Sequence, residues 1–323
     1  MTMVEFTVRV AAVRHEAEGI VSLELVAPDG GALPAFSAGA HVDVLLPGLP
    51  ARQYSLCNPP SETHRYQIAV LREPASRGGS RHLHECVTVD DVLTLGGPRN
   101  HFPLAPEARR SLLIAGGIGI TPLLAMAEAL STAGARFDLH YCARSRDRMA
   151  FAGRLATAPY RDRVHLHLDD GPSAQHLEVA KVLAAPLPGD HLYVCGPSGF
   201  LDWIRRAAAA EGWPEERVHT EYFSGQVDQR DDDAAFEIEV QDTGLIVPVA
   251  KGQTALNALL AAGIDVPHSC EEGVCGMCMT QVLDGTPDHR DQFLTAGERK
   301  RNDCFMPCCS RALSARLVVT ADY

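Results

Sequence analysis

The chain has 323 residues, 46% of them hydrophobic, and a formal net charge of −12 at pH 7. This length is sufficient for two or three domains, and the acidic balance argues against a nucleic-acid partner, which usually requires a basic face. The sequence shows no signal segment and no apolar run near the roughly 18 residues of a membrane span, and its ten cysteines suggest reduced thiols or metal ligands; we therefore expect a cytoplasmic monomer that does not bind membranes.

Residues 1–106 are predicted to form an antiparallel β-barrel. Apolar and polar residues alternate over residues 6–10, 21–25 and 66–70, as they do in half-buried strands. Gly- and Pro-rich breaks separate these runs.

Residues 107–226 alternate strand and helix patterns. A buried strand over 112–115 leads into a Gly-rich turn and a helix, with Thr121 as N-cap and Pro122 at the first helical position. Further strands are expected over residues 137–142, 164–168 and 191–195. This alternation predicts a doubly wound parallel sheet.

Residues 227–235 are charged and poor in apolar side chains, so we interpret them as a linker; an acidic surface loop within one domain is the alternative. Residues 236–323 then show two hairpin strands, a helix over 255–262 that ends at Gly263, and a cysteine-rich loop. They predict a compact α+β module.

The cysteine-rich loop has the spacing C-x4-C-x2-C, followed by 29 residues and a further cysteine. This is the plant-type spacing for a 2Fe–2S cluster, whose two irons require four thiolates. A structural zinc site is the alternative, but such sites usually have two C-x2-C pairs and this chain has one. The predicted ligands are Cys270, Cys275, Cys278 and Cys308.

The fourth ligand is the least certain member of this set from spacing alone, because Cys304, Cys308 and Cys309 lie close together. Spacing favours Cys308, since the residues after it lead into a closing strand over 317–319. We expect the cysteines in the first two segments to be ordinary thiols, at positions Cys57, Cys86 and Cys142.

Two turns in the second segment fit a nucleotide. Residues 115–122 join a strand to a helix through three glycines, which would let a pyrophosphate approach the helix N-terminus. Residues 193–197 close a later strand and open another helix. Both turns would lie at the carboxyl ends of parallel strands, where doubly wound sheets bind ligands.

The barrel carries two sets of residues that suit a flavin. Arg52 could meet a phosphate, Tyr54 could lie against the isoalloxazine ring, and Ser55 could hydrogen-bond a ring nitrogen. Residues 77–83 offer backbone N–H groups and a helix start to the same phosphate.

Taken in order, these motifs resemble the ferredoxin–NADP reductase superfamily, specifically the phthalate dioxygenase reductase type that includes vanillate O-demethylase reductases. The resemblance covers the whole chain and implies a β-grasp fold for the third segment. It implies flavin contacts from Arg52, Tyr54, Ser55, Gly78, Gly79, Ser80 and Phe223. It implies a nicotinamide dinucleotide site formed by Gly117, Thr121, Arg144, Cys195, Gly196 and Pro197.

The sequence departs from many relatives at Met277, where they have Thr or Ser between the last two loop cysteines. We expect this change to alter the reduction potential of the cluster rather than its presence.

The resemblance implies a reductase that passes electrons from NADH to FMN, then to 2Fe–2S, and finally to a separate Rieske-type oxygenase. Asp169 and Asp170 would repel the 2′-phosphate of NADPH, whereas Arg144, Arg146 and Arg148 could bind it, so the resemblance decides for NADH. A reductase of a cytochrome P450 or another acceptor, or a redox sensor without turnover, remains the alternative.

Overall fold

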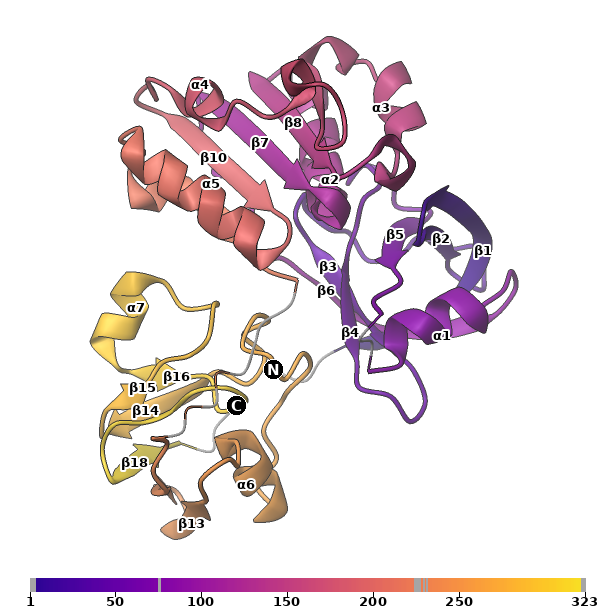
Figure 1. The fold of residues 1–323 in the computed structure, drawn as a ribbon. Coiled ribbons are helices and arrows are strands. Elements are labelled where there is room, and N and C mark those ends of the chain that lie inside the picture. Colours follow the sequence, from indigo (N-terminus) through magenta and orange to yellow (C-terminus); the bar gives the residue numbers. More distant parts are fainter. Residues whose placement is uncertain (1–3, 75–76, 224–227, 229, 231, 321–323) are drawn as a thin grey trace. The chain divides into compact units, whose positions relative to one another are not determined.

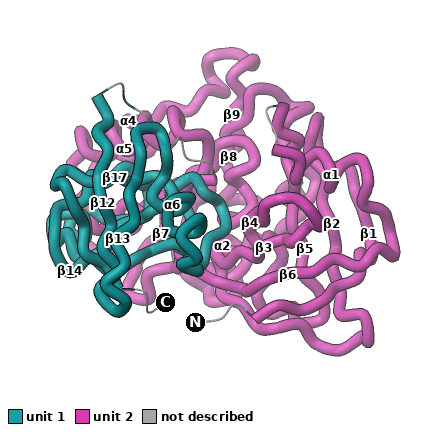
Figure 2. Tube along the Cα trace, turned by 90° about the horizontal axis from the view of Figure 1, so that it is seen from below, with its two compact units in different colours: residues 1, 224–323 teal, residues 2–223 magenta. Residues whose placement is uncertain are grey.

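The computed structural model describes residues 4–74, 77–223, 228, 230 and 232–320. The chain divides into two compact units, residues 2–223 and residues 224–323 (Figure 2). Each is described by itself.

The first part of residues 2–223 is a six-stranded antiparallel sheet with the strand order β4-β3-β6-β1-β2-β5 (Figure 1). A bridge between Leu56 and Ile68 links the two ends of this order, so the sheet curls into a barrel. Val8, Leu23 and Leu95 fill its interior, as the alternating pattern requires. The elements are β1 (Glu5–Ala17), β2 (Ile20–Val26), β3 (His41–Leu45), β4 (Arg52–Ser55), β5 (Tyr66–Leu71), α1 (Gly79–Glu85) and β6 (Val92–Arg99).

The second part is a five-stranded parallel sheet with the order β11-β10-β7-β8-β9. The chain runs outward from β7 through β8 to β9, then returns to β10 on the other side of β7, so the order reverses between β7 and β10. The strands are β7 (Arg110–Gly116), β8 (Phe137–Ala143), β9 (Val164–Leu168), β10 (Asp190–Cys195) and β11 (Val218–Glu221). The α-helices are α2 (Ile120–Thr132), α3 (Ala152–Thr157), α4 (Val179–Leu183) and α5 (Ser198–Ala210).

Helix α2 joins these two parts. Leu123 and Met126 are fully buried and share one apolar cluster with Ala17, Ile20 and Ala69 of the barrel. Barrel and parallel sheet therefore have a common core, which is why α2 is apolar on nearly all sides.

Residues 224–323 contain a five-stranded sheet with the order β13-β12-β18-β14-β16. Strands β12 and β18 pair in parallel although they come from opposite ends of this unit. Thr254 caps one helix, and Thr295 with Glu298 forms a capping box on the other. The elements are β12 (Phe236–Val240), β13 (Leu245–Val249), α6 (Ala255–Ala261), β14 (Thr280–Asp284), β15 (Pro287–Asp288), α7 (Ala296–Arg301), β16 (Cys304–Phe305), β17 (Arg311–Ala312) and β18 (Arg316–Val319).

The sequence predicted this architecture, and the expected fold class is confirmed: an antiparallel barrel, a doubly wound sheet and an α+β module. The structure adds a feature that the sequence did not predict. Asp233, in the segment interpreted as a linker, is buried among arginines of the 224–323 unit, whereas residues 227, 229 and 231 lie outside the described residues. None of the helices in the described ranges is long and apolar enough to cross a lipid bilayer.

Candidate functional site

The two predicted nucleotide turns lie against each other where the strand order reverses. They follow the neighbouring strands β7 and β10. A Cβ atom at Gly119 would overlap the Cys195 carbonyl, and one at Gly196 would lie 3.1 Å from the Cα of Gly116. Only glycines allow the two backbones to approach so closely, at the position where open α/β sheets bind ligands.

Glu221, at the end of β11, connects this region to the barrel. It lies opposite Cys195 in the parallel register, with 3.9 Å between Cys195 Sγ and its Oε2 atom. The Ser55 hydroxyl of β4 hydrogen-bonds the same carboxyl group. Burial raises the pKa of Glu221 to about 8, against the effect of these two hydrogen bonds. Ser55, which is predicted to contact flavin, and Cys195, which is predicted to contact the dinucleotide, thus both interact with the Glu221 carboxyl group.

Sequence reasoning missed Glu221. Glu221 ends a short, mostly polar strand that carries no distinctive signal, and the pairing of β11 with β10 is not visible in the sequence. Thr121, predicted to belong to the dinucleotide site, is buried in the first turn of α2, where its hydroxyl donates to the Ile118 carbonyl at 3.0 Å. It is not the N-cap that the sequence predicted, because α2 begins at Ile120 and Gly119 occupies the cap position.

The predicted phosphate contacts converge at the start of α1. A Cβ atom at Gly79 would lie 2.9 Å from Cγ of Arg52, so that side chain crosses directly over the glycine. Gly78 has a φ of +109°, which favours glycine, and Ser80 Oγ accepts from the Glu73 N–H at 3.3 Å. A guanidinium beside glycine backbone and a buried hydroxyl is a donor set that fits a flavin phosphate.

The ring contacts are less enclosed. Tyr54 is half-buried, and burial raises the pKa of its hydroxyl. Phe223 is 39% exposed.

The residues weighed for the 2′-phosphate lie at the ends of β8 and β9. The Asp170 N–H donates to the Arg144 carbonyl at 3.0 Å, so the acidic and basic candidates are neighbours. Arg148 forms a two-pronged ion pair with Glu18 of the barrel, with both hydrogen bonds at 3.0 Å. The Nε and Nη2 atoms of Arg148 are therefore paired with a barrel carboxylate rather than directed at a 2′-phosphate.

The predicted cluster ligands are all buried in the 224–323 unit. Gly273 and Gly276 both have a φ of +73°, and the chain turns there so that N–H groups point at sulfur. The N–H of Glu272 lies 3.3 Å from Cys270 Sγ, and that of Met277 lies 3.5 Å from Cys275 Sγ. Thiols surrounded by inward N–H donors fit a 2Fe–2S cluster.

Cys308 differs from its two neighbours. It accepts hydrogen bonds from the Cys278 and Cys309 thiols and from the Gly273 N–H, which lower its pKa. Cys304 is only half-buried, and burial raises its pKa to about 11. Cys309 Sγ lies 3.8 Å from both the Met306 carbonyl and the Ser310 hydroxyl.

In the described part of the chain, no group of three or more His, Cys, Asp or Glu side chains is arranged to hold a metal ion.

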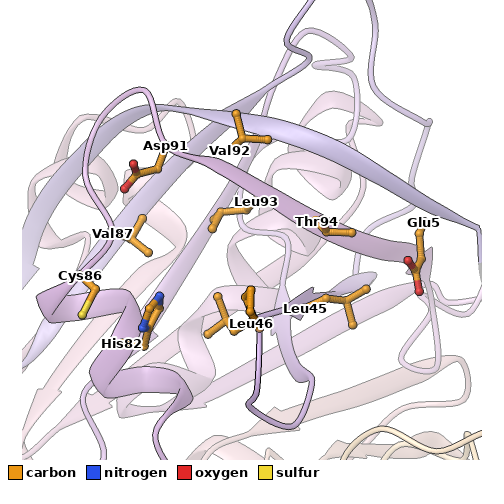
Figure 3. A pocket seen from close by; sticks show the side chains of 11 residues that line it. Glu5, Leu45, Leu46, His82, Cys86, Val87, Asp91, Val92, Leu93 and Thr94 are labelled. Atoms are coloured by element: carbon orange, nitrogen blue, oxygen red, sulfur yellow. The ribbon is translucent and has the colours of Figure 1, made fainter.

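A pocket of about 570 Å³ lies elsewhere on the barrel (Figure 3). His82 of α1, Cys86 just after this helix, Leu45, Leu46 and Leu93 of β6 are among the residues that line it. Of the segment 77–83 only His82 lines this pocket, and none of the side chains predicted to contact flavin does.

Comparison with known proteins identifies the domain types of two of the three segments. Residues 113–206 match the oxidoreductase NAD-binding domain, and residues 238–313 match the 2Fe-2S iron-sulfur cluster binding domain. A vanillate O-demethylase oxidoreductase of Pseudomonas sp. strain HR199 is 51% identical over 310 residues, covering 96% of this chain and 98% of the relative.

The chain belongs to the phthalate dioxygenase reductase family. The solved structure of phthalate dioxygenase reductase, described as modular for electron transfer from pyridine nucleotides to [2Fe-2S], has a TM-score of 0.74 and 36% identity, covering 98% of each chain. An intact type IV self-sufficient cytochrome P450 monooxygenase has a TM-score of 0.88 and 41% identity, covering 98% of this chain and 41% of that one. The chain is therefore an oxidoreductase with a nicotinamide-binding domain and a 2Fe–2S domain, of the type that serves as the reductase component of multicomponent oxygenases.

Proposed function

We propose that this reductase takes a hydride from NADH on FMN and passes the electrons singly through its 2Fe–2S cluster to a separate Rieske-type oxygenase. The observation that carries the proposal is the meeting of Ser55 and Cys195 on Glu221, which joins the barrel to the nucleotide turns. A bound flavin supplies the conversion between a two-electron hydride and single electrons.

In this proposal the chain binds and orients the cofactors. Arg52, Gly79 and Ser80 would hold the flavin phosphate, and the Ser55 hydroxyl would hydrogen-bond a ring nitrogen. The turns at Gly117 and at Cys195–Pro197 receive the dinucleotide, with Phe223 covering the flavin. Cys270, Cys275, Cys278 and Cys308 hold the cluster.

FMN rather than FAD is proposed from the family resemblance at residues 77–83. Releasing the flavin by heat and separating it chromatographically tests this directly. Recovery of FAD would contradict the assignment.

NADH is proposed as the donor because Asp169 and Asp170 end β9 beside Arg144, and because Arg148 is paired with Glu18. A carboxylate near the ribose repels a 2′-phosphate. We expect kcat/KM for NADH to exceed that for NADPH; an equal or higher value with NADPH would overturn this choice.

The proposed acceptor is a Rieske-type oxygenase, in keeping with the demethylase system for which the 51% identical relative is named. The likeness to the reductase portion of a self-sufficient P450 supports a second candidate, a separate P450. Purified reductase should restore NADH-dependent turnover to a Rieske oxygenase and not to a P450 at equal concentration; the reverse result would favour the second candidate. We further propose a monomer in the cytoplasm, where reducing conditions suit a chain whose ten cysteines form no disulfide.

A further inference from the structure

A buried network of ion pairs in the 224–323 unit has no role in the proposed function. Arg290 and Asp233 each leave only 4% of the side chain exposed. Two hydrogen bonds join them, one of them 3.0 Å from Arg290 Nη1 to Asp233 Oδ2. Buried charges are retained only where such pairing is nearly complete.

Both partners are held from further sides. Asp288 Oδ2 accepts from Nε and Nη2 of Arg290 at 2.8 and 2.6 Å. Arg311 Nε lies 3.8 Å from Asp233 Oδ2, and its other nitrogens donate to the carbonyls of Ala234, Ala250 and Gln253. Asp233 is thus enclosed between two arginines, and the hydrogen bond from Arg290 is the main cause of its pKa of about 2.

One end of this ion-pair network holds the segment by which the chain enters the unit. Arg290 Nη1 donates to the Asp228 carbonyl, and the Arg230 N–H donates to Asp233 Oδ2 at 3.1 Å. The Asp233 N–H returns to the Arg230 carbonyl at 3.1 Å.

The other end of the network contacts the segments that carry the predicted 2Fe–2S ligands. The Arg290 N–H donates to Ser310 Oγ at 3.1 Å, two residues after Cys308. The Gln292 N–H donates to the Gly273 carbonyl at 2.9 Å, inside the cysteine loop. Arg290 therefore contacts the entering segment with its side chain and the ligand-bearing chain with its backbone.

We propose that Arg290 is a positioning residue that clamps the entering segment to the cluster-binding chain and thereby speeds electron transfer to the cluster. The kinetic part rests on the proposed flavin-to-cluster transfer. A chain held from Asp228 onward is connected to residues 2–223 by a shorter segment than one held only from β12 onward, and a shorter connection raises the effective concentration of flavin and cluster. Release of Asp228 and Asp233 would lengthen that connection without removing a cluster ligand.

The test compares Arg290→Gln with Arg316→Gln in the full-length holoenzyme. Arg316 is 41% exposed and pairs with Glu237 and Glu239 in the same unit, so its loss removes the same charge away from the clamp. In Arg290→Gln we expect hydrogen exchange of the Arg230 and Asp233 amides at least tenfold faster. We also expect flavin reduction by NADH at the normal rate, unchanged cluster absorbance and electron paramagnetic resonance, and cluster reduction at least threefold slower in stopped flow.

Three results would overturn the clamp: unchanged amide exchange, unchanged cluster reduction, or the same slowing in Arg316→Gln. If Arg290→Gln loses the cluster or does not fold, Arg290→Lys replaces it, since lysine keeps the charge but lacks the planar fork of donors that pairs with Asp233 and Asp288 together. It should show an intermediate exchange rate and an intermediate transfer rate, and normal values for both would refute the proposal. If NADH did not reduce the flavin of the unaltered protein, the proposed function would fail. Amide exchange would still test the clamp.

Discussion

Glu221 shows how much a single side chain depends on its surroundings. Its carboxyl group interacts both with Ser55, which is predicted to contact flavin, and with Cys195, which is predicted to contact the dinucleotide. Burial raises its pKa to about 8, so the protonated form predominates in the folded protein at neutral pH.

This pKa predicts a pH dependence of stability. The unfolded chain releases the Glu221 proton near its ordinary pKa of 4.5, and the folded protein near 8. The folded state therefore binds more protons between these values, and its stability falls as pH rises through that window. Glu221→Gln should remove this loss and raise Tm by about 2–4 °C at pH 8.5, as about 1 kcal/mol does in a domain of this size, with little change at pH 4.5.

Thermal denaturation between pH 4.5 and 8.5 provides the measurement. Glu216→Gln, the same change on an exposed side chain just before β11, should track the unaltered protein throughout. Parallel pH profiles for all three proteins would show that Glu221 ionises normally.

At the scale of elements, the nucleotide site depends on the close approach of two turns. A Cβ atom at Gly119 would overlap the Cys195 carbonyl, and backbone cannot move aside as a flexible side chain can. Gly119→Ala should therefore separate the turns and raise KM for NADH at least tenfold, a loss of about 1.4 kcal/mol.

Flavin content should be unchanged in that variant, because the phosphate contacts lie on α1. Gly153→Ala is the control: a Cβ atom there meets nothing within 4 Å, in helix α3, and alanine suits a helix interior. Equal KM values for the two variants would show that the close approach is unimportant for binding.

The cysteine loop gives a second prediction at this scale. Cys308→Ser should abolish iron content and the visible absorbance of the cluster while flavin remains, because a serine hydroxyl does not replace a thiolate ligand. Cys304→Ser and Cys309→Ser should keep both signals. A colourless Cys309→Ser protein would assign the fourth ligand to the next residue.

Local patterns were enough to predict the elements and most candidate residues, because strand alternation, turn glycines and cysteine spacing are properties of short segments. Contacts between distant segments were not predictable in the same way. Asp233 looked like part of a solvated acidic linker because its partners, Arg290 and Arg311, come much later in the chain. Glu221 was missed for the same reason, since its role arises from strand order.

At the scale of the whole molecule, we expect electrostatic attraction to guide the docking of the proposed protein acceptor. The chain carries a net charge of −12, and Glu271 and Glu272 stand in the cluster loop beside Cys270. Transient electron-transfer complexes use small, charge-steered interfaces, so oxygenase reduction should slow as salt rises.

Glu271→Lys should lower the rate of oxygenase reduction severalfold at low salt, with little effect on NADH oxidation by ferricyanide. The matched control, Glu237→Lys, reverses a charge on β12, away from the cysteine loop. Stopped-flow reduction of the oxygenase across a salt series distinguishes the two. Equal rates for both variants, or no dependence on salt, would place the docking surface elsewhere.

The parallel pairing of β12 with β18 has a consequence for synthesis. Residues 2–223 contain their own sheets, so they can fold while the rest of the chain is still on the ribosome. The sheet of the second unit lacks an inner strand until residues 316–319 have emerged, and Cys308 emerges only shortly before them. The nascent protein is therefore expected to pass through a stage in which residues 2–223 are folded while the sheet around the four predicted cluster ligands is still incomplete.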